Sequence, residues 1–410
     1  MTLLNGLAII VACLLAVPCL VFSAECIVAL LPGGRGASPA PPSAPRPRAV
    51  VIVPAHDEQA GIAATVAALA PLLGADDRML VVADNCSDQT AAAARAAGAE
   101  VIERHDSTQR GKGFAIVFAL DHLAAAPPDV VIVVDADCRL SADGLAILAR
   151  EAAANNRPVQ GEYVLATPER PTPRGVLSAL AVLVRNRVRP LGLRRLGLPS
   201  QLTGSGMAFP WSVLRAAPHP GANLVEDLVM GLELALAGHA PLMCPSVRVS
   251  SELPEGDSAA LGQRRRWEHG QLATLLRYAP RLIGRGLIRG RADLLALGLD
   301  LCVPPLALLV TIVGAAVLGT FALAMLTGGS KVPVTLSLLA FSGLAISVLG
   351  AWIKFGGAEF PLRYIFMVPL YVLWKIPLYL AFIVRGKHKS WDRTQRKGEA
   401  RRPDERPPVI

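Results

Sequence analysis

Long apolar blocks at both ends of the chain enclose a middle region, residues 49–292, of ordinary charge. The apolar blocks cover residues 1–31, 294–326, 332–353 and 361–384. Each is near or above the roughly 20 residues that a helix needs to cross about 30 Å of hydrocarbon. In the first block Glu25 is the only charged residue. The pattern predicts an N-terminal transmembrane anchor over residues 1–31 and transmembrane or re-entrant helices over residues 293–384.

Basic residues beside the apolar blocks predict the orientation. Arg35, Arg46 and Arg48 follow the first block, and such residues favour the cytoplasmic side of a span. The middle region of an inner-membrane protein is therefore expected in the cytoplasm. The basic tail from Arg385 is expected there too, whereas one N-terminal and three C-terminal crossings would place it outside. One C-terminal block is therefore expected to be interfacial or re-entrant, and the number of spans stays open.

Prolines mark where the C-terminal blocks are interrupted. Pro304 and Pro305 are expected to split the block 294–326. Pro369, Lys375 and Pro377 interrupt the block 361–384, which makes it the strongest candidate for an interfacial or re-entrant segment.

The middle region has the pattern of an α/β domain. Short runs of β-branched residues without alternation occupy residues 49–53, 79–83 and 130–134, and Ala-rich helical stretches occupy residues 59–73, 88–97 and 111–126. Strands of this kind are buried on both faces of a sheet. Their alternation with helices predicts a Rossmann-like, doubly wound sheet.

The remaining segments complete the predicted domain organisation. They are a Pro- and Ala-rich linker over residues 32–48, a cytoplasmic α/β domain over residues 49–255, interfacial amphipathic helices over residues 256–292, and a basic cytoplasmic tail over residues 385–410.

Composition excludes several classes of protein. The mean hydropathy of +0.44 is too high for a purely cytosolic enzyme. The net charge of +9 gathers near the apolar blocks, where anionic lipid headgroups explain it more simply than nucleic acid does. The seven cysteines form no CxxC pair, so neither a zinc site nor a disulfide framework is indicated. No GxGxxG or GxxxxGK[ST] loop follows a predicted strand, which argues against NAD enzymes and P-loop NTPases.

Acidic residues follow each of the three predicted strands. Asp57 and Glu58 follow the first, Asp84 the second, and Asp135-Ala136-Asp137 the third. Ligands in doubly wound sheets bind beyond the carboxyl ends of the strands. Carboxylates that converge there repel one another unless a cation or hydrogen-bond donors lie between them.

Two further motifs follow along the chain. Glu226-Asp227 begins a predicted helix that continues over residues 228–237. Gln263, Arg266 and Trp267 lie at positions i, i+3 and i+4, which places them on one helical face. The order of these motifs, ahead of membrane-length blocks, is harder to explain by chance than any motif alone.

In these motifs and their order, the chain resembles the membrane-embedded family 2 glycosyltransferases, the group of the cellulose, hyaluronan, chitin-oligosaccharide and poly-N-acetylglucosamine synthases. The resemblance implies a GT-A-type mixed sheet domain with transmembrane and interfacial helices. The motifs lie within residues 49–290, and the flanking apolar blocks match in arrangement.

The resemblance assigns a donor site. It implies Asp137 as the ligand of Mg²⁺ or Mn²⁺ and Asp135 as a contact to the metal or the ribose, and such ions use carboxylates and substrate phosphates as ligands. It implies that Asp84 contacts the edge of the uracil ring and that Lys112 contacts the diphosphate or the nucleoside. The residues expected to wrap the nucleoside are Pro54, Ala55 and Glu58. An N-cap role is favoured for Asp88, and a solvated loop position for His56.

The resemblance also assigns a base and an acceptor site. It implies Asp227, paired with Glu226, as the base that accepts the proton of the acceptor hydroxyl. Arg266 is expected at the departing diphosphate, and Trp267 with Gln263 at the acceptor sugar. The loop Gly204-Ser205-Gly206 is expected to line the acceptor end, although a plain turn explains it equally well. Val225 stands where the family usually has Thr.

The expected function is that of an inverting, metal-dependent glycosyltransferase that moves a sugar from a nucleotide donor, UDP-linked in the first instance, to a saccharide acceptor in envelope or exopolysaccharide synthesis. The alternative is non-processive transfer to a lipid carrier or glycolipid. An alternative of another class is a catalytically silent scaffold of a polysaccharide assembly. The expected partners are the donor, the acceptor, membrane lipids and assembly subunits.

Overall fold

The structure is a computed structural model that describes residues 2–33, 45–166, 172–218, 225–252 and 257–385. The chain divides into two compact units. The sheet unit contains the described residues within 37–168 and 199–270. The helical unit contains those within 1–36, 169–198 and 271–388. Most of the predicted linker and nearly all of the basic tail lie outside the described residues.

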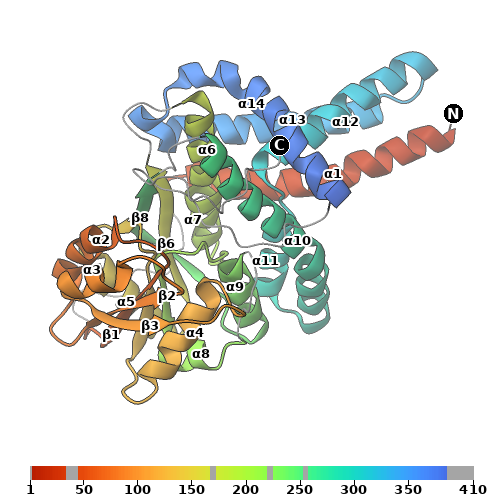
Figure 1. Ribbon diagram of the computed structural model, residues 1–410. Helices are drawn as coiled ribbons and strands as arrows, with labels where there is room; N and C mark the ends of the chain where they lie inside the picture. Colours follow the sequence, from red (N-terminus) through yellow and green to blue (C-terminus); the bar gives the residue numbers. More distant parts are fainter. Residues whose placement is uncertain (1, 34–44, 167–171, 219–224, 253–256, 386–410) are drawn as a thin grey trace. The chain divides into compact units, whose positions relative to one another are not determined.

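The sheet unit is built on one eight-stranded mixed sheet with the order β3-β2-β1-β4-β7-β6-β8-β5 (Figure 1). Its strands are β1 (Ala49–Ala55), β2 (Arg78–Asp84), β3 (Glu100–Arg104), β4 (Val130–Val133), β5 (Cys138–Leu140), β6 (Val159–Ala166), β7 (Met207–Pro210) and β8 (Leu242–Glu252). The first four strands pair in parallel, and β7 joins them antiparallel to β4. The predicted GT-A-type mixed α/β sheet is thereby confirmed.

Helices cover the sheet and complete its core. They are α2 (Ile62–Leu69), η1 (Ala70–Leu72), α3 (Thr90–Ala96), α4 (Lys112–Leu123), α5 (Gly144–Asn155), α8 (Trp211–Arg215) and α9 (Glu226–Leu236). Ile52, Leu80 and Val131 of the central strands are fully or almost fully buried and pack with Leu120 of α4 and Leu234 of α9. Two-sided burial explains why these strands consist of apolar residues without alternation.

The predicted strands and helices of the sheet unit are confirmed, with shifted ends. Pro54 and Ala55, which lie beyond the predicted strand 49–53, occupy the last two positions of β1, and Asp84 is the last residue of β2. The first predicted helix begins later, at Ile62, and ends in a 3₁₀ turn. The predicted helix after Glu226-Asp227 is α9, which begins at Glu226 itself.

The helical unit contains elements from three separate parts of the chain. They are α1 (Thr2–Leu30), α6 (Pro173–Leu183), the π-helix η2 (Val184–Val188), α7 (Arg189–Arg195), α11 (Ala292–Leu301), α12 (Leu306–Thr327), α13 (Val332–Ala351), the short helices η3 (Trp352–Gly356), η4 (Gly357–Glu359) and η5 (Leu362–Met367), and α14 (Val368–Arg385). The long helix α10 (Asp257–Arg289) continues from the sheet unit into this unit. A buried cluster that includes Phe22, Val188, Leu309 and Leu344 joins α1, η2, α12 and α13.

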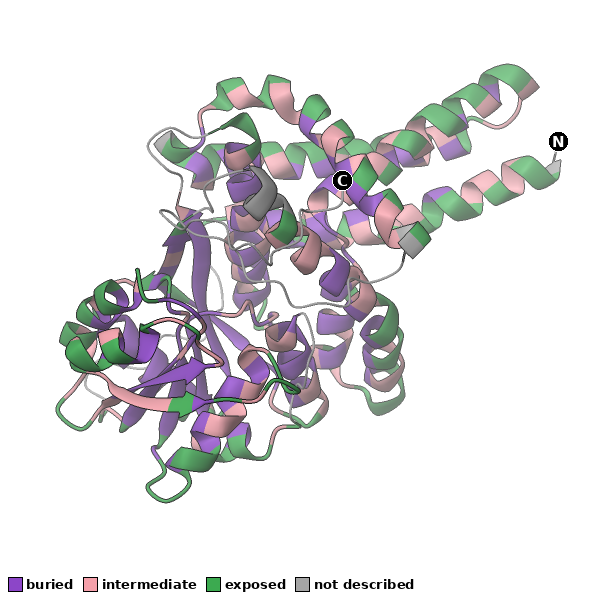
Figure 2. Ribbon diagram, in the orientation of Figure 1, coloured by how far each residue is buried: buried purple, intermediate pink, exposed green. Residues whose placement is uncertain are grey.

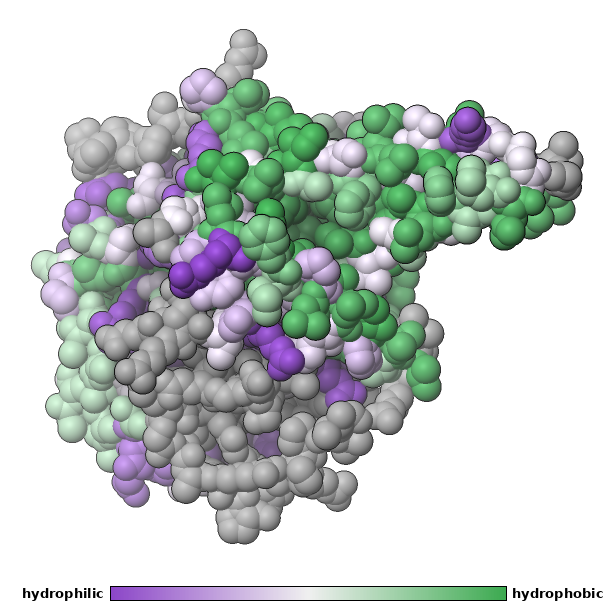
Figure 3. Space-filling model, turned by 90° about the horizontal axis from the view of Figure 1, so that it is seen from above, coloured by the Kyte–Doolittle hydropathy of each residue, from purple (hydrophilic) through white to green (hydrophobic). Residues whose placement is uncertain are grey.

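Four helices within the described residues are long and apolar enough to cross a membrane, as judged by length and composition. They span Leu3–Leu30, Leu306–Thr327, Val332–Gly356 and Leu362–Phe382. Much of the surface over α1 and α12 is hydrophobic (Figure 3). The expected split at Pro304 and Pro305 is confirmed, because α11 ends at Leu301 and α12 begins at Leu306. The block 361–384 meets the criterion of a span, although it contains a 3₁₀ helix and an internal Pro377.

Candidate functional site

A lysine stands at the centre of the candidate site, at the carboxyl ends of the parallel strands. Lys112 is the first residue of α4, and Gly111 before it has a φ of 128°, which a residue with a side chain rarely adopts. Lys112 Nζ lies 2.5 Å from Asp135 Oδ1 and donates a hydrogen bond to the carbonyl oxygen of Gly204. The amine therefore joins the loop after β4 to the loop before β7.

The loop Gly204-Ser205-Gly206 lies against two of the predicted functional carboxylates. A Cβ atom added to Gly204 would lie 3.2 Å from Asp227 Oδ2 and 3.9 Å from Lys112 Nζ. Ser205 is buried, and its Oγ accepts a hydrogen bond of 3.0 Å from the backbone N–H of Asp135. Gly206 packs against Val249, where a Cβ atom would lie 2.3 Å from a methyl carbon. The structure thus brings Asp135, Asp227, Lys112 and this loop together.

The charges of this cluster are unbalanced. Lys112 supplies one positive charge, whereas Asp135, Asp137, Glu226 and Asp227 supply up to four negative charges. Burial would lower the pKa of Lys112, but Asp135 and Glu226 outweigh burial and raise that pKa above its ordinary value. Burial also raises the pKa of Asp135, with Lys112 acting against the rise. Burial and the neighbouring Asp227 raise the pKa of Glu226 to about 7.

The residues around Asp135 fit a hard divalent cation. Ligand atoms of Asp135, Asp137 and Cys138 lie within 4.8 Å of one another, and Asp137 is exposed. Burial raises the pKa of the Cys138 thiol well above its usual range, so the two carboxylates are the suitable ligands for Mg²⁺ or Mn²⁺. A cation would also offset the repulsion among the carboxylates.

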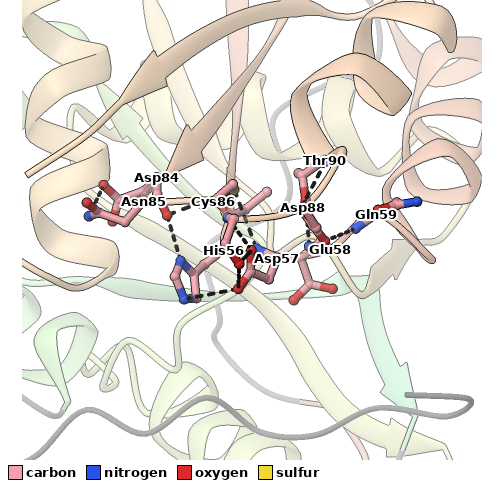
Figure 4. A network of polar contacts seen from close by, with 11 residues as sticks. His56, Asp57, Glu58, Gln59, Asp84, Asn85, Cys86, Asp88 and Thr90 are labelled. Atoms are coloured by element: carbon pink, nitrogen blue, oxygen red, sulfur yellow. Dashed lines mark hydrogen bonds and ion pairs between the residues drawn. The ribbon is translucent and has the colours of Figure 1, made fainter. Parts of the chain in front are cut away.

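A second group of potential ligands holds two loops together instead. Asp57, Cys86 and Asp88 also lie close enough for a metal, but backbone N–H groups point at both carboxylates. Ser87 N donates to Asp57 Oδ1 at 2.6 Å, and Thr90 N donates to Asp88 Oδ1 at 3.0 Å. Figure 4 shows how this network ties the loop after β1 to the loop after β2. The N-cap position of α3 is Gln89, so Asp88 lies one residue before the cap that was predicted for it, although its carboxylate accepts from the first N–H of the helix.

The other predicted residues of these loops lie in the same network. Glu58 is buried, and its backbone N–H donates to Thr90 Oγ1 at 2.7 Å. The ring of His56 is half-buried, with Nδ1 2.7 Å from the carbonyl oxygen of Asp84, so the prediction of a solvated loop histidine is only partly right (Figure 4). Both loops are therefore fixed by internal bonds before any ligand arrives.

Asp84 has a buried partner that the sequence did not indicate. Arg104, at the end of β3, donates from Nη1 to Asp84 Oδ1 at 2.7 Å and to the carbonyl oxygen of Gln109 at 2.8 Å. Its guanidinium lies 5.6 Å from the ring centroid of Phe114 on α4. Arg104 thus connects the predicted base-binding carboxylate to the loop that leads to Lys112.

Two more residues hold loops of the site in place through hydrogen bonds. Thr65 on α2 donates to the carbonyl oxygen of Ala136 at 2.5 Å, which holds the loop between Asp135 and Asp137. The side-chain amide of Gln160 on β6 accepts from Thr203 N and donates to the carbonyl oxygen of Ser205, both at 2.8 Å. Neither residue belongs to a recognisable motif, since their positions follow from strand pairing between remote segments.

The predicted helical motif lies on α10. Gln263, Arg266 and Trp267 are half-buried on this helix. A Cβ atom added to Gly270 would lie 2.7 Å from Val225, the residue before Glu226. Because Arg266 precedes Gly270 by four residues, both lie on one helical face. This packing brings the face that carries Arg266 towards the start of α9.

Comparisons with known proteins identify the family of the chain and support its fold. The family model described as "Glycosyltransferase like family 2" matches residues 45–270, and the chain belongs to this family. No curated protein matches the sequence. Among solved structures, the mannosyltransferase PcManGT from Pyrobaculum calidifontis, in complex with GDP-Man and Mn²⁺, is 18% identical with a TM-score of 0.54, over 85% of this chain and 98% of that one.

A second solved structure is glucosyl-3-phosphoglycerate synthase from Mycobacterium tuberculosis, in complex with Mn²⁺, UDP and phosphoglyceric acid. It is 22% identical with a TM-score of 0.37, over 55% of this chain and 78% of that one. The family assignment confirms the expected glycosyltransferase, and the likeness to PcManGT supports its fold.

Proposed function

We propose that this protein is a membrane-bound, inverting glycosyltransferase that transfers a sugar from a nucleotide donor to a saccharide acceptor. The observation that carries the proposal is the meeting of Asp135, Lys112, Gly204 and Asp227 at one edge of the sheet. Such a transfer requires a carboxylate that can bind a metal ion, a cation that can bind phosphate, and a second carboxylate that can act as a base beside the acceptor loop.

The donor would bind along the carboxyl ends of β1, β2 and β4. Asp135 and Asp137 would hold Mg²⁺ or Mn²⁺, which supplies charge neutralisation of the diphosphate when bound. Asp84, held by Arg104, would contact the base, and Pro54, Ala55 and Glu58 would enclose the nucleoside. Lys112 and Arg266 would bind the diphosphate. Both solved neighbours carry Mn²⁺ with a nucleotide or nucleotide sugar, one GDP-linked and one UDP-linked, so both nucleotides belong in a donor screen.

The acceptor would lie between the loop Gly204-Ser205-Gly206 and the face of α10 that carries Gln263 and Trp267. The acceptor hydroxyl would attack the anomeric carbon while Asp227 accepts its proton, and the bond to the diphosphate would break in the same displacement. Glu226, with its pKa raised to about 7, would be partly protonated near neutral pH, which would weaken its repulsion of the neighbouring Asp227.

A saccharide acceptor in envelope or exopolysaccharide synthesis, with assembly subunits as partners, extends the resemblance described above. Transfer to a lipid carrier or glycolipid is the second candidate, and the four membrane-length helices of the described chain favour it, since a wide polysaccharide channel needs more. In either case Arg46 and Arg48, after the first apolar helix, favour a cytoplasmic sheet unit at the inner membrane.

The test is nucleotide release by the full-length protein in detergent, against a panel of UDP- and GDP-sugars with Mg²⁺, Mn²⁺ or EDTA. We expect metal-dependent release with one donor and a loss of about 10²–10⁴-fold in Asp227→Asn, because general base catalysis contributes that much. Unchanged release by Asp227→Asn would refute its role as base. Donor binding is measured in parallel. Donor binding without nucleotide release indicates an enzyme that lacks its acceptor. The absence of both binding and release indicates a silent scaffold and contradicts the proposal.

A further inference from the structure

The loop that carries Asp135 and Asp137, named here the metal loop (residues 135–138), is hydrogen-bonded to Ser205. The backbone N–H of Asp135 donates to Ser205 Oγ at 3.0 Å. A side-chain hydrogen bond also joins Ser205 to Cys138, the residue after Asp137. The Cys138 thiol in turn donates to Asp137 Oδ1 at 3.5 Å. Ser205 is therefore connected to both carboxylates that are the suitable ligands for a metal ion.

The donors and acceptors of this connection are consistent with one another. A serine hydroxyl accepts hydrogen bonds through its lone pairs and donates one proton. Because Ser205 Oγ accepts from the backbone of Asp135, its proton is left for the sulfur of Cys138. The thiol proton is then left for Asp137. One series of bonds thus runs from the backbone of Asp135 to the side chain of Asp137, with Ser205 between them.

The backbone around Ser205 is fixed from two sides. The side-chain amide of Gln160 accepts from Thr203 N and donates to the carbonyl oxygen of Ser205, both at 2.8 Å. Gly206 N donates to the carbonyl oxygen of Val133, the last residue of β4, at 2.9 Å. The strands β4, β6 and β7 around these bonds are buried (Figure 2). Ser205 is therefore held in place relative to the strand that leads into the metal loop.

Ser205 and its neighbour Gly204 face different groups. Gly204 has a φ of 100°, and a Cβ atom added to it would lie 3.2 Å from Asp227 Oδ2, so its open side faces the proposed base. The side chain of Ser205 bonds to the metal loop instead, and Ser205 is 0% exposed. A side chain without exposed surface is not available to an acceptor. The acceptor contact expected of this loop can therefore come from Gly204 but not from the hydroxyl of Ser205.

We propose that Ser205 is a positioning residue of the metal site and not an acceptor contact. It acts through the backbone of Asp135 and the thiol of Cys138, and so fixes the two carboxylates that would share one ion. Residues that orient metal ligands in this way change metal affinity by about 10–100-fold when they are replaced. The inference rests on the proposed function, in which Asp135 and Asp137 hold Mg²⁺ or Mn²⁺.

The Mn²⁺ affinity of the full-length protein in detergent tests this inference without any turnover. Free Mn²⁺ is measured by electron paramagnetic resonance during a titration with UDP present, and with GDP in parallel. Ser205→Ala should bind Mn²⁺ about 10–100-fold more weakly than the unaltered protein. Ser200→Ala is the matched control, because Ser200 is equally buried and its Oγ has no hydrogen-bond partner within the described residues. This control should bind Mn²⁺ as tightly as the unaltered protein.

Variants of Cys138 separate positioning from a general loss of stability. Cys138→Ala removes the donor to Asp137 and should weaken Mn²⁺ binding several-fold. Cys138→Ser keeps a donor at this position and should restore most of the affinity. The Tm of every variant is measured in parallel. If Ser205→Ala does not fold, this pair decides the question, and equal Mn²⁺ affinity of Cys138→Ala and the unaltered protein overturns the inference.

The outcomes for Ser205→Ala distinguish this inference from the proposed function. A lower Tm with unchanged Mn²⁺ affinity would mean that Ser205 only stabilises the fold, and the inference alone would be wrong. Unaltered protein that binds no Mn²⁺ with either nucleotide would contradict the proposed metal site, and the inference would fall with it.

Discussion

Arg189 in the helical unit and Lys112 in the sheet unit each lie among carboxylates, and the two clusters differ in how far they are buried. In the helical unit, Arg189 of α7 donates from Nε to Glu25 of α1 at 2.6 Å and from Nη2 to the carboxylate of Asp300 on α11. All three side chains are at most 6% exposed. In the sheet unit, Lys112 is 15% exposed and its partner Asp135 is 33% exposed.

The difference matches the chemistry of the two cations. The planar fork of arginine fixes two carboxylates in one geometry, whereas the lysine ammonium is a point charge on a flexible stem that can exchange partners. The Arg189 cluster joins three helices from remote parts of the chain, and its three side chains are almost fully buried. The Lys112 cluster is open on the side of Asp137, so an incoming metal and diphosphate can take over its charges. The Arg189 cluster is suited to stabilise the helical unit, and the Lys112 cluster is suited to bind a ligand.

The largest expected effect comes from breaking the closed cluster. Arg189→Met leaves Glu25 and Asp300 buried without their cation, and removal of one partner of a buried pair costs about 3–5 kcal/mol. We expect a large drop in the Tm of the detergent-solubilised protein. Arg189→Lys, which keeps the charge and loses the fork, should fall between this variant and the unaltered protein. A Tm of Arg189→Met equal to that of the unaltered protein would show that the cluster does not hold the helices together.

The open cluster should respond in binding and not in stability. Lys112→Met removes the contact to Asp135 and the proposed contact to diphosphate, and the expected result is about a tenfold weaker affinity for the donor, close to 1.4 kcal/mol. Its Tm should stay near that of Arg95→Met, a control that removes one exposed charge of the same unit. If Lys112→Met were destabilised as strongly as Arg189→Met, the contrast between the two clusters would be wrong.

The raised pKa of Glu226 predicts a pH-dependent stability of the open cluster. In the folded state this carboxyl keeps its proton up to a pKa of about 7, against an ordinary value of 4.5. The folded state therefore binds more protons between these values, and stability falls as pH rises from about 4.5 to about 7. Glu226→Gln should lack this part of the decline, which is about 3 kcal/mol at most, because each pKa unit corresponds to about 1.4 kcal/mol.

This prediction is checked by chemical denaturation in EDTA, without donor, across pH 4.5–8 for both proteins. The Glu226→Gln variant should be the more stable of the two above pH 7, and the two should converge at acid pH. Parallel curves across the whole range would mean that Glu226 titrates normally.

The smallest effect is expected at the edge of the open cluster. Arg104→Lys keeps a positive charge beside Asp84 but cannot bind Asp84 and the Gln109 carbonyl in the same way, so the donor KM should rise by a few-fold, about 1 kcal/mol, with little change in kcat. Arg104→Met should raise the donor KM further. A fall in kcat with an unchanged KM would place Arg104 in the chemical step and not in donor positioning.

The local sequence pattern was sufficient to predict much of the sheet unit. Uninterrupted β-branched runs such as 130–134 are determined by burial on both faces, so the central strands and the acidic residues at their ends could be predicted. The motifs around Asp135, Asp227 and Arg266 are short and contiguous, so their identity does not depend on distant pairing. The break at Pro304 and Pro305 is likewise a local consequence of the missing N–H groups.

Tertiary structure decided what depends on remote partners. The strand β3 is half-exposed and lacks a clear apolar run, so neither it nor Arg104 was predicted. Gln160 reaches the loop before β7 only through the pairing of β6 with β7. Residues 172–198 lie between two strands in the sequence, yet they belong to the helical unit with α1.

Glu25 shows the division most clearly. The sequence by itself determined that one charge interrupts an otherwise apolar helix, because composition is a local property. That this charge meets Arg189 and Asp300 was decided only in the folded chain, where helices separated by more than a hundred residues pack together and leave no water to solvate an isolated carboxylate.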